Sequence, residues 1–115
     1  MEIGERAGTI SVARHDKSCV VAGKGELDLA VGQEYRSALK TVVDSGLPPV
    51  ADLLEVGFID SAILAALAEA ASTLYRLGDR LTVVVLDGSH PQYVLKVTGM
   101  SEIMDVVTKE SADPA

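Results

Sequence analysis

A serine at a predicted strand-to-helix junction is the residue with the clearest chemical potential in this sequence. Ser61 directly follows Asp60, and its hydroxyl could attack a substrate or accept a phosphoryl group. A hydrolase nucleophile of the G-x-S-x-G type needs two flanking glycines and a base, yet residues 59–63 are I-D-S-A-I and no base is evident. The sequence therefore disfavours a hydrolase, and we predict no catalytic residue.

Elsewhere in the chain, the residues that could bind a nucleotide or a metal, or accept a phosphoryl group, do not have the required spacing. Residues 23–25, G-K-G, do not match the phosphate loop G-x-x-x-x-G-K-[ST]. Asp52 and Asp60 could suggest the phosphoacceptor of a response regulator, but the paired acidic residues that hold magnesium after a first strand are missing. Cys19 is the only cysteine, and with two histidines it is short of clustered zinc ligands. We therefore predict neither a cofactor nor a metal.

Hydrophobic spacing predicts alternating strands and helices around these residues. Residues 8–27 alternate as two short strands joined by a polar turn, and residues 31–46 carry the apolar stripe of an amphipathic helix. A buried strand over residues 50–56 follows. A long helix over residues 61–77 comes next and stops at Gly78.

The last part of the chain predicts one further strand and two short helices. Residues 81–86 are the strongest strand, and their composition suits a strand covered on both faces. A short helix starts at Pro91 and closes at Gly99, and residues 103–107 suggest a final helix.

The predicted fold is a single α/β domain. Its mixed sheet of about four to five strands begins with an antiparallel hairpin and continues through right-handed parallel crossovers, with about four helices. One domain accounts for residues 1–115, with an ordered core at about 8–109 and frayed ends at 1–7 and 110–115.

The strand-to-helix loops of such a sheet share one edge, where binding sites are usually built. Four side chains of interest fall there: Glu26, Asp28, Asp60 and Ser61. The long helix places its core stripe on one side, namely Ile63, Leu64, Leu67, Ala71 and Leu74. Its outer side begins with the small Ala62 and Ala65, and polar side chains such as Glu69 come only further along. Tyr35 and Phe58 are expected in the core.

Composition and charge exclude several classes of function. Ten Lys and Arg against seventeen Asp and Glu give a formal charge of −7, which would repel a phosphate backbone. The few aromatic residues are scattered, so nucleic-acid binding is disfavoured. The sequence has no apolar run long enough to cross a bilayer and does not begin like a secretory signal, so we expect a cytoplasmic protein that is not bound to a membrane.

Three segments resemble motifs of the STAS domain family, and within it the small bacterial anti-sigma factor antagonists. Residues 25–29, G-E-L-D-L, look like the family's G-E-L-D signature, and residues 58–61, F-I-D-S, look like its F-[IM]-D-S-S-G-L motif. Residues 94–100, V-L-K-V-T-G-M, are similar to its V-L-x-L-T-G-L segment. The likeness covers roughly residues 20–107, and the three motifs occur in the family's order.

This resemblance implies a regulated binding module without enzymatic activity. In the family, the serine after the motif's aspartate is the phosphoacceptor, a position held here by Ser61. The unmodified domain binds an anti-sigma factor, typically also an ATP-dependent serine kinase, and so frees a sigma factor. Phosphorylation then ends the contact, and a phosphatase resets the domain. The implied partner surface comprises Glu26, Asp28, Asp60, Ser61, Ala62, Ala65 and Glu69.

Simpler interpretations remain open for several of these residues. Asp60 or Ser61 could be only the N-cap of the long helix, and Asp28 could cap the first helix or end a strand. Ala62 replaces the motif's second serine, so any phosphorylation in this turn should fall on Ser61. Ile63 stands where the family usually has glycine.

Two further alternatives concern the whole domain. The outer alanines could reflect helix propensity alone. The domain could also be a STAS-type scaffold, sensor or nucleotide-binding module that does not act on a sigma factor. In addition, the exposed edge of the hairpin could pair with a second copy to form a homodimer.

Overall fold

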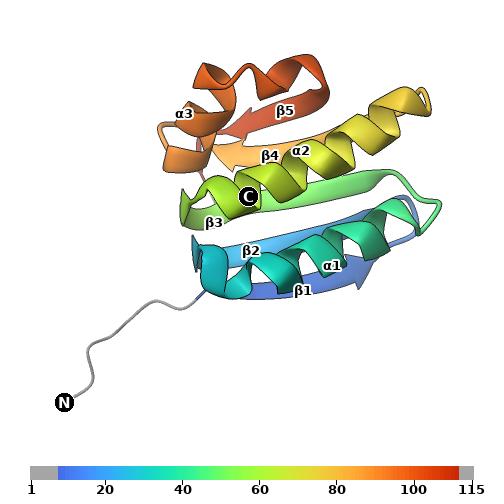
Figure 1. The fold of residues 1–115 in the computed structure, drawn as a ribbon, viewed down its shortest axis with the longest axis horizontal. Coiled ribbons are helices and arrows are strands. Elements are labelled where there is room, and N and C mark those ends of the chain that lie inside the picture. Colours follow the sequence, from blue (N-terminus) through green and yellow to red (C-terminus); the bar gives the residue numbers. More distant parts are fainter. Residues whose placement is uncertain (1–7, 112–115) are drawn as a thin grey trace.

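A five-stranded mixed sheet carries three α-helices on one of its faces (Figure 1). The computed structural model describes residues 8–111. The strands are β1 (Thr9–Arg14), β2 (Cys19–Leu27), β3 (Pro49–Ile59), β4 (Leu81–Leu86) and β5 (Met104–Lys109). The helices are α1 (Gly32–Val43), α2 (Ser61–Arg76) and α3 (His90–Val97). Two 3-10 turns, η1 (Leu29–Val31) and η2 (Met100–Glu102), precede α1 and β5.

The strands lie in the order β1-β2-β3-β4-β5. β1 pairs antiparallel with β2, and β2 to β5 pair parallel with their neighbours. Each helix connects two adjacent parallel strands, and right-handed crossovers that all run in one direction place the three helices on the same face. The predicted mixed sheet with a leading hairpin is confirmed, and it has five strands.

The predicted final helix is wrong. Residues 8–111 contain three α-helices rather than four, and most of residues 103–107 belongs to β5. β5 pairs with β4 from Leu81↔Met104 to Leu86↔Lys109. The segment contains successive β-branched residues, which favour a strand. The open edge of β4 also offers hydrogen-bond partners to its backbone, whereas a helix of one and a half turns would form few backbone hydrogen bonds. The prediction that residues 1–7 and 110–115 fray lies mostly outside the described residues.

One face of the sheet is buried under the helices and the other is only half-buried. In β4, Leu81, Val83 and Val85 are buried, whereas the alternate residues are intermediate. The expectation that this strand is covered on both faces is therefore wrong. Three crossovers in one direction put every helix on the same side, so within residues 8–111 the helices leave the other face open. Pairing of the β1 edge with a second copy stays a prediction.

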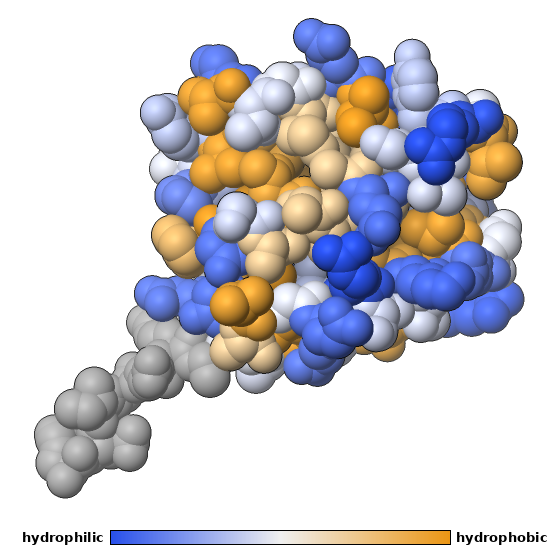
Figure 2. Space-filling view, in the orientation of Figure 1, coloured by the Kyte–Doolittle hydropathy of each residue, from blue (hydrophilic) through white to orange (hydrophobic). Residues whose placement is uncertain are grey.

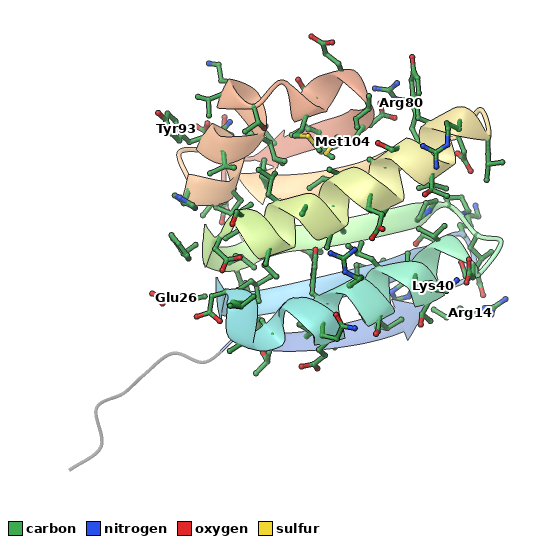
Figure 3. The ribbon with its side chains drawn as sticks, in the orientation of Figure 1. Arg14, Glu26, Lys40, Arg80, Tyr93 and Met104 are labelled. Atoms are coloured by element: carbon green, nitrogen blue, oxygen red, sulfur yellow. The ribbon has the colours of Figure 1, made fainter. Side chains whose placement is uncertain are left out.

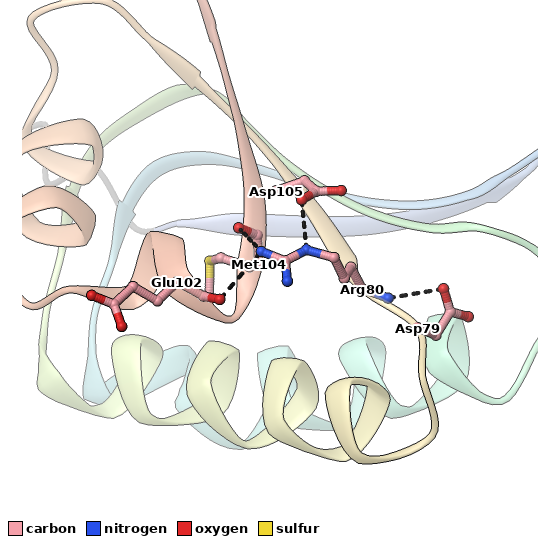
Figure 4. Close-up of polar contacts among 5 residues, drawn as sticks. All are labelled: Asp79, Arg80, Glu102, Met104 and Asp105. Carbon is pink, nitrogen blue, oxygen red and sulfur yellow. Dashed lines mark hydrogen bonds and ion pairs between the residues drawn. The ribbon is translucent and has the colours of Figure 1, made fainter.

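Arg80, which directly precedes β4, links the start of that strand to the start of β5 by hydrogen bonds (Figure 4). The Nε of Arg80 donates to Oδ1 of Asp105 at 2.7 Å, and its Nη2 donates to the carbonyl oxygens of Met104 at 3.1 Å and Glu102 at 3.3 Å. The Arg80 N–H donates to Oδ1 of Asp79 at 2.8 Å. These bonds hold the start of β5 in register with β4.

The core fills the space between the sheet and the helices. It is built from aliphatic side chains of all three helices and of β2 to β5, together with the fully buried Tyr35 of α1, which confirms the expectation for that residue. The predicted core stripe of α2 is also confirmed, except that Leu64 is half-buried. Within residues 8–111, every helix is too short or too polar to cross a lipid bilayer.

Candidate functional site

The ends of β2 and β3 bring the two acidic motifs together. In their parallel register, Glu26 pairs with Phe58, and Leu27 pairs with Ile59. The Asp60 N–H then donates to the carbonyl oxygen of Leu27 at 3.2 Å. The loop after β2 and the turn that opens α2 are therefore neighbours, as expected for strand-to-helix loops at one sheet edge.

Asp60 is the N-cap of α2. Its backbone is extended (φ −104°, ψ −174°), and its Oδ1 accepts hydrogen bonds from the N–H of Ala62 at 3.0 Å and of Ile63 at 3.2 Å. The Leu64 N–H donates to the Asp60 carbonyl oxygen at 3.0 Å, which is the first bond of the helix. The capping interpretation of Asp60 is confirmed, and a contact between Asp60 and a partner stays a prediction.

Ser61 is the first residue of α2, and its side chain is exposed. Since Asp60 provides the cap, the interpretation of Ser61 as N-cap is wrong. Among residues 8–111, the Ser61 hydroxyl takes part in no hydrogen bond. An exposed hydroxyl that caps nothing can be modified without breaking an existing bond.

The loop after β2 leads into α1, whose first residue, Gly32, lies close to this turn. A Cβ built on Gly32 would lie 3.5 Å from the Cβ of Ala62, which is ordinary van der Waals contact. Asp28 lies at the start of the same loop and is exposed, and its Oδ1 accepts from the Ala30 N–H at 3.0 Å. Asp28 is thus a cap, but of the short turn η1 that precedes α1.

The small outer residues of α2 lie beside Ser61, whereas Glu69 lies apart. Ala65 is exposed and Ala62 is half-buried. Glu69 is exposed and forms an ion pair with Arg36 of α1. Glu69 is eight residues from Ser61, or about 12 Å along the helix axis. It borders a groove of about 340 Å³ between α1 and α2 instead of the sheet edge.

Sequence reasoning did not find an aromatic pair that lies next to the Ser61 turn. Phe58, expected in the core, is 40% exposed, and its ring stacks on that of His90 with centroids 4.7 Å apart. His90 is the first residue of α3, and its Nδ1 accepts from the Ile59 N–H at 3.2 Å. Ile59 is buried, so the two-residue alternation of a strand turns Phe58 away from the core. A sequence prediction that extended this strand to Ile59 would have placed Phe58 on its outward face.

Carboxylates outnumber basic side chains at the sheet edge that carries Ser61 (Figure 3). The loops after β2, β3 and β4 and the first turns of the helices that follow carry no Lys or Arg. Their carboxylates are Asp28, Glu34, Asp60 and Asp87, and Glu26 lies near the end of β2. Lys109 ends β5 at the same edge, where the Asp87 N–H donates to its carbonyl oxygen at 2.7 Å. The basic Arg14, Lys40 and Arg80 lie toward the opposite edge. Within residues 8–111, no group of three or more His, Cys, Asp and Glu side chains is placed to hold a metal ion. The edge with Ser61 therefore presents a hydroxyl, small side chains, several carboxylates and the lysine at the end of β5.

Comparison with known proteins identifies the family of this chain. A family model described as "Mlab, STAS domain" matches residues 10–108, most of the chain. The chain belongs to the STAS domain family. No curated protein matches it.

Solved structures similar to this STAS domain include anti-sigma factor antagonists. An anti-sigma factor antagonist from Mycobacterium paratuberculosis is 26% identical, with a TM-score of 0.76 over 88% of this chain and 86% of that one. The anti-sigma factor antagonist SpoIIAA in its unphosphorylated form is 16% identical, with a TM-score of 0.64 over 90% of each chain. The phosphorylated form of SpoIIAA, a Bacillus cell fate determinant, is 19% identical, with a TM-score of 0.64 over 89% of this chain and 94% of that one. The predicted family and fold are thus confirmed.

Proposed function

We propose that this STAS domain is an anti-sigma factor antagonist controlled by phosphorylation of Ser61. Its unphosphorylated form binds an anti-sigma factor, which then releases a sigma factor in the cytoplasm. The anti-sigma factor is a serine kinase that phosphorylates Ser61 and so ends the contact, and a phosphatase restores the binding form. The domain itself catalyses nothing. The observation that carries this proposal is the exposed Ser61 hydroxyl at the start of α2, within the F-I-D-S segment.

The unmodified site suits close packing by a partner. Ser61 and Ala65 are exposed on successive turns of α2, and Gly32 and Ala62 pack beside them with little side-chain bulk. A surface of small side chains lets another backbone approach closely and exclude water. Glu26 and Asp28 at the neighbouring loop would meet polar or basic groups of that partner.

A phosphoryl group on Ser61 would change the charge of this surface more than its fold. It adds about −1.5 to −2 charges beside the carboxylate of Asp60. The N–H groups of Ala62 and Ile63, which could otherwise hold the phosphate, already donate to Asp60. The new charge therefore remains on the surface, and a bound partner would have to desolvate it. Burial of unpaired charge costs several kcal/mol, and about 1.4 kcal/mol is a tenfold loss of affinity.

A kinase assay tests the modification. The purified domain is incubated with ATP and each serine kinase of the anti-sigma factor class from the source bacterium, and phosphate is mapped by mass spectrometry. We expect one phosphate on Ser61, none on Ser61→Ala, and normal modification of Ser37→Ala, a control at an exposed serine of α1. Phosphate on another residue, or on none, would contradict the proposal.

A binding assay tests the switch. The affinity of the anti-sigma factor is measured for the unmodified domain, for Ser61→Asp and for Ser61→Asn, which has nearly the same shape but no charge. We expect Ser61→Asp to bind at least about tenfold more weakly than Ser61→Asn, because charge rather than size blocks the contact. Equal affinities of the two variants would exclude an electrostatic switch.

A further inference from the structure

The structure shows an exposed apolar strip that begins beside Ser61 and continues along α3. Phe58 is 40% exposed and stacks on His90, the first residue of α3. Tyr93 and Val97 follow on α3 and are 64% and 59% exposed. Residues three and four positions apart in a helix are surface neighbours, so His90, Tyr93 and Val97 form one row. We call these four residues the α3 strip.

The α3 strip adjoins a wider apolar area of the same face. Figure 2 shows apolar side chains gathered between the first half of α2 and α3. The elements that border this area carry the half-buried Leu64, Val94 and Met100. Single exposed apolar residues are common on protein surfaces, but a connected group of them marks a binding surface.

The charges around the α3 strip select the kind of partner. Asp87 precedes α3 and is exposed, and the ends of β2 and β3 add Glu26, Asp28 and Asp60. The lysines nearby are Lys96, which lines a surface hollow with Asp87 and Tyr93, and Lys109 at the end of β5, so carboxylates outnumber basic groups around the strip. In Figure 3, Glu26 and Tyr93 lie at the same edge. A second copy that docked there through the same surface would oppose its own carboxylates, which is unfavourable. A surface with apolar groups flanked by Lys and Arg would be complementary.

A stable contact with a partner needs more buried area than the Ser61 turn can provide. A specific protein interface usually buries about 800 Å² on each partner and is centred on a few large side chains, often aromatic. Ser61, Ala62 and Ala65 are small and cannot supply such a centre. Phe58 and Tyr93 are the large aromatic side chains exposed at this edge within residues 8–111.

We propose that the α3 strip is a second contact region for the anti-sigma factor, whose matching surface is apolar and basic. This inference rests on the proposed function, since the same partner occupies both regions. Ser61 controls whether the complex forms, and the α3 strip supplies much of its affinity. Asp87 and the neighbouring carboxylates speed association by attracting the basic groups of the partner.

The test measures the dissociation constant and the association rate with the purified anti-sigma factor that binds the unmodified domain. We expect Tyr93→Ala to weaken binding by about tenfold or more and Tyr93→Phe to leave it nearly unchanged, because the ring makes the contact. The control is Tyr75→Ala, since Tyr75 is 53% exposed at the far end of α2, and it should change the affinity by less than about twofold. Both side chains are on the surface, so thermal unfolding should confirm that the three variants fold.

A second pair of variants tests the electrostatic part of the proposal. Asp87→Asn should slow association about twofold to threefold at low salt, whereas Asp16→Asn, the same change in the β1–β2 turn, should not. If Ser61→Asp abolishes binding while Tyr93→Ala and Val97→Ala bind like the unmodified domain, the inference fails and the proposed function stands. If the unmodified domain binds no anti-sigma factor, both fail. A dimer that Tyr93→Ala dissociates would assign the strip to a second copy and overturn the inference.

Discussion

Replacement of Tyr35 by phenylalanine should stabilise the domain. Tyr35 is fully buried, and its hydroxyl is the buried side-chain polar atom without a hydrogen-bond partner among residues 8–111. A hydroxyl taken out of water without a new bond costs about 1–3 kcal/mol. Phenylalanine keeps the ring and its packing, so the free energy of unfolding should rise by about 1 kcal/mol. For a domain of this size, that is an increase of about 4 °C in Tm.

Alkaline pH should enlarge the difference between Tyr35→Phe and the wild type. Burial, with a smaller contribution from the negative charge of Asp52, raises the pKa of the Tyr35 phenol above its ordinary value. The unfolded phenol has a pKa of about 10, so above that pH the unfolded chain loses a proton that the folded chain keeps. The wild type then loses up to about 1.4 kcal/mol of stability per pH unit through this group. The variant lacks the phenol, and its advantage should grow to about 2 kcal/mol at pH 11.

Urea unfolding followed by circular dichroism at pH 8 and pH 11 measures both effects. Tyr93→Phe is the matched control, because Tyr93 is 64% exposed and loses the same atom at the surface. Its stability should equal that of the wild type at both values of pH, within about 0.5 kcal/mol. If Tyr35→Phe is instead less stable than the wild type at pH 8, the hydroxyl has a bonding partner in solution and the reasoning is refuted.

Substitutions at three further residues test the elements around the site, two by urea unfolding and one by amide exchange. Asp60→Ala should lower the free energy of unfolding by about 1 kcal/mol and Asp60→Asn by less, because two N–H groups of α2 lose their acceptor; equal stability of all three forms would contradict the cap. Ile63→Ala should cost about 2–5 kcal/mol, since Ile63 is fully buried. Arg80→Ala should speed amide exchange in β5 more than in β2, because its bonds to Asp105 and to the start of β5 are lost.

Sequence reasoning located the centre of the site because several local signals agree there. The predicted helix over residues 61–77 and the observed α2, Ser61–Arg76, differ by one residue. Asp60 caps the first turn, the buried residues recur at helical spacing, and Gly78 has the positive φ of +80° that ends a helix. Each signal depends only on nearby residues, so it can be recognised without knowledge of the tertiary structure.

The errors arose where tertiary contacts or an irregular strand decide the structure. Residues 104–109 form a strand because the edge of β4 is available to pair with them, which no local pattern reveals. The expectation that Phe58 lies in the core is wrong, because the residue is 40% exposed. The register of β2 and β3 shifts between Gly25 and Glu26, so the alternation that would have identified the outward face of β3 is interrupted. The aromatic pair with His90 was therefore missed.

The local structure explains how one modification could change binding while the fold stays intact. A negative group in the first turn of a helix gains about 0.3–1 kcal/mol from the helix dipole, and repulsion by the neighbouring Asp60 carboxylate offsets part of this gain. The start of α2 is held by the Asp60 cap and by the buried Ile63, neither of which involves the Ser61 hydroxyl. The folded domain thus gains or loses little from the charge, whereas a partner must desolvate it. Ser61→Asp should accordingly unfold within about 1 kcal/mol of the wild type in urea while its affinity falls, and a large loss of stability would mean that charge at Ser61 acts through the fold.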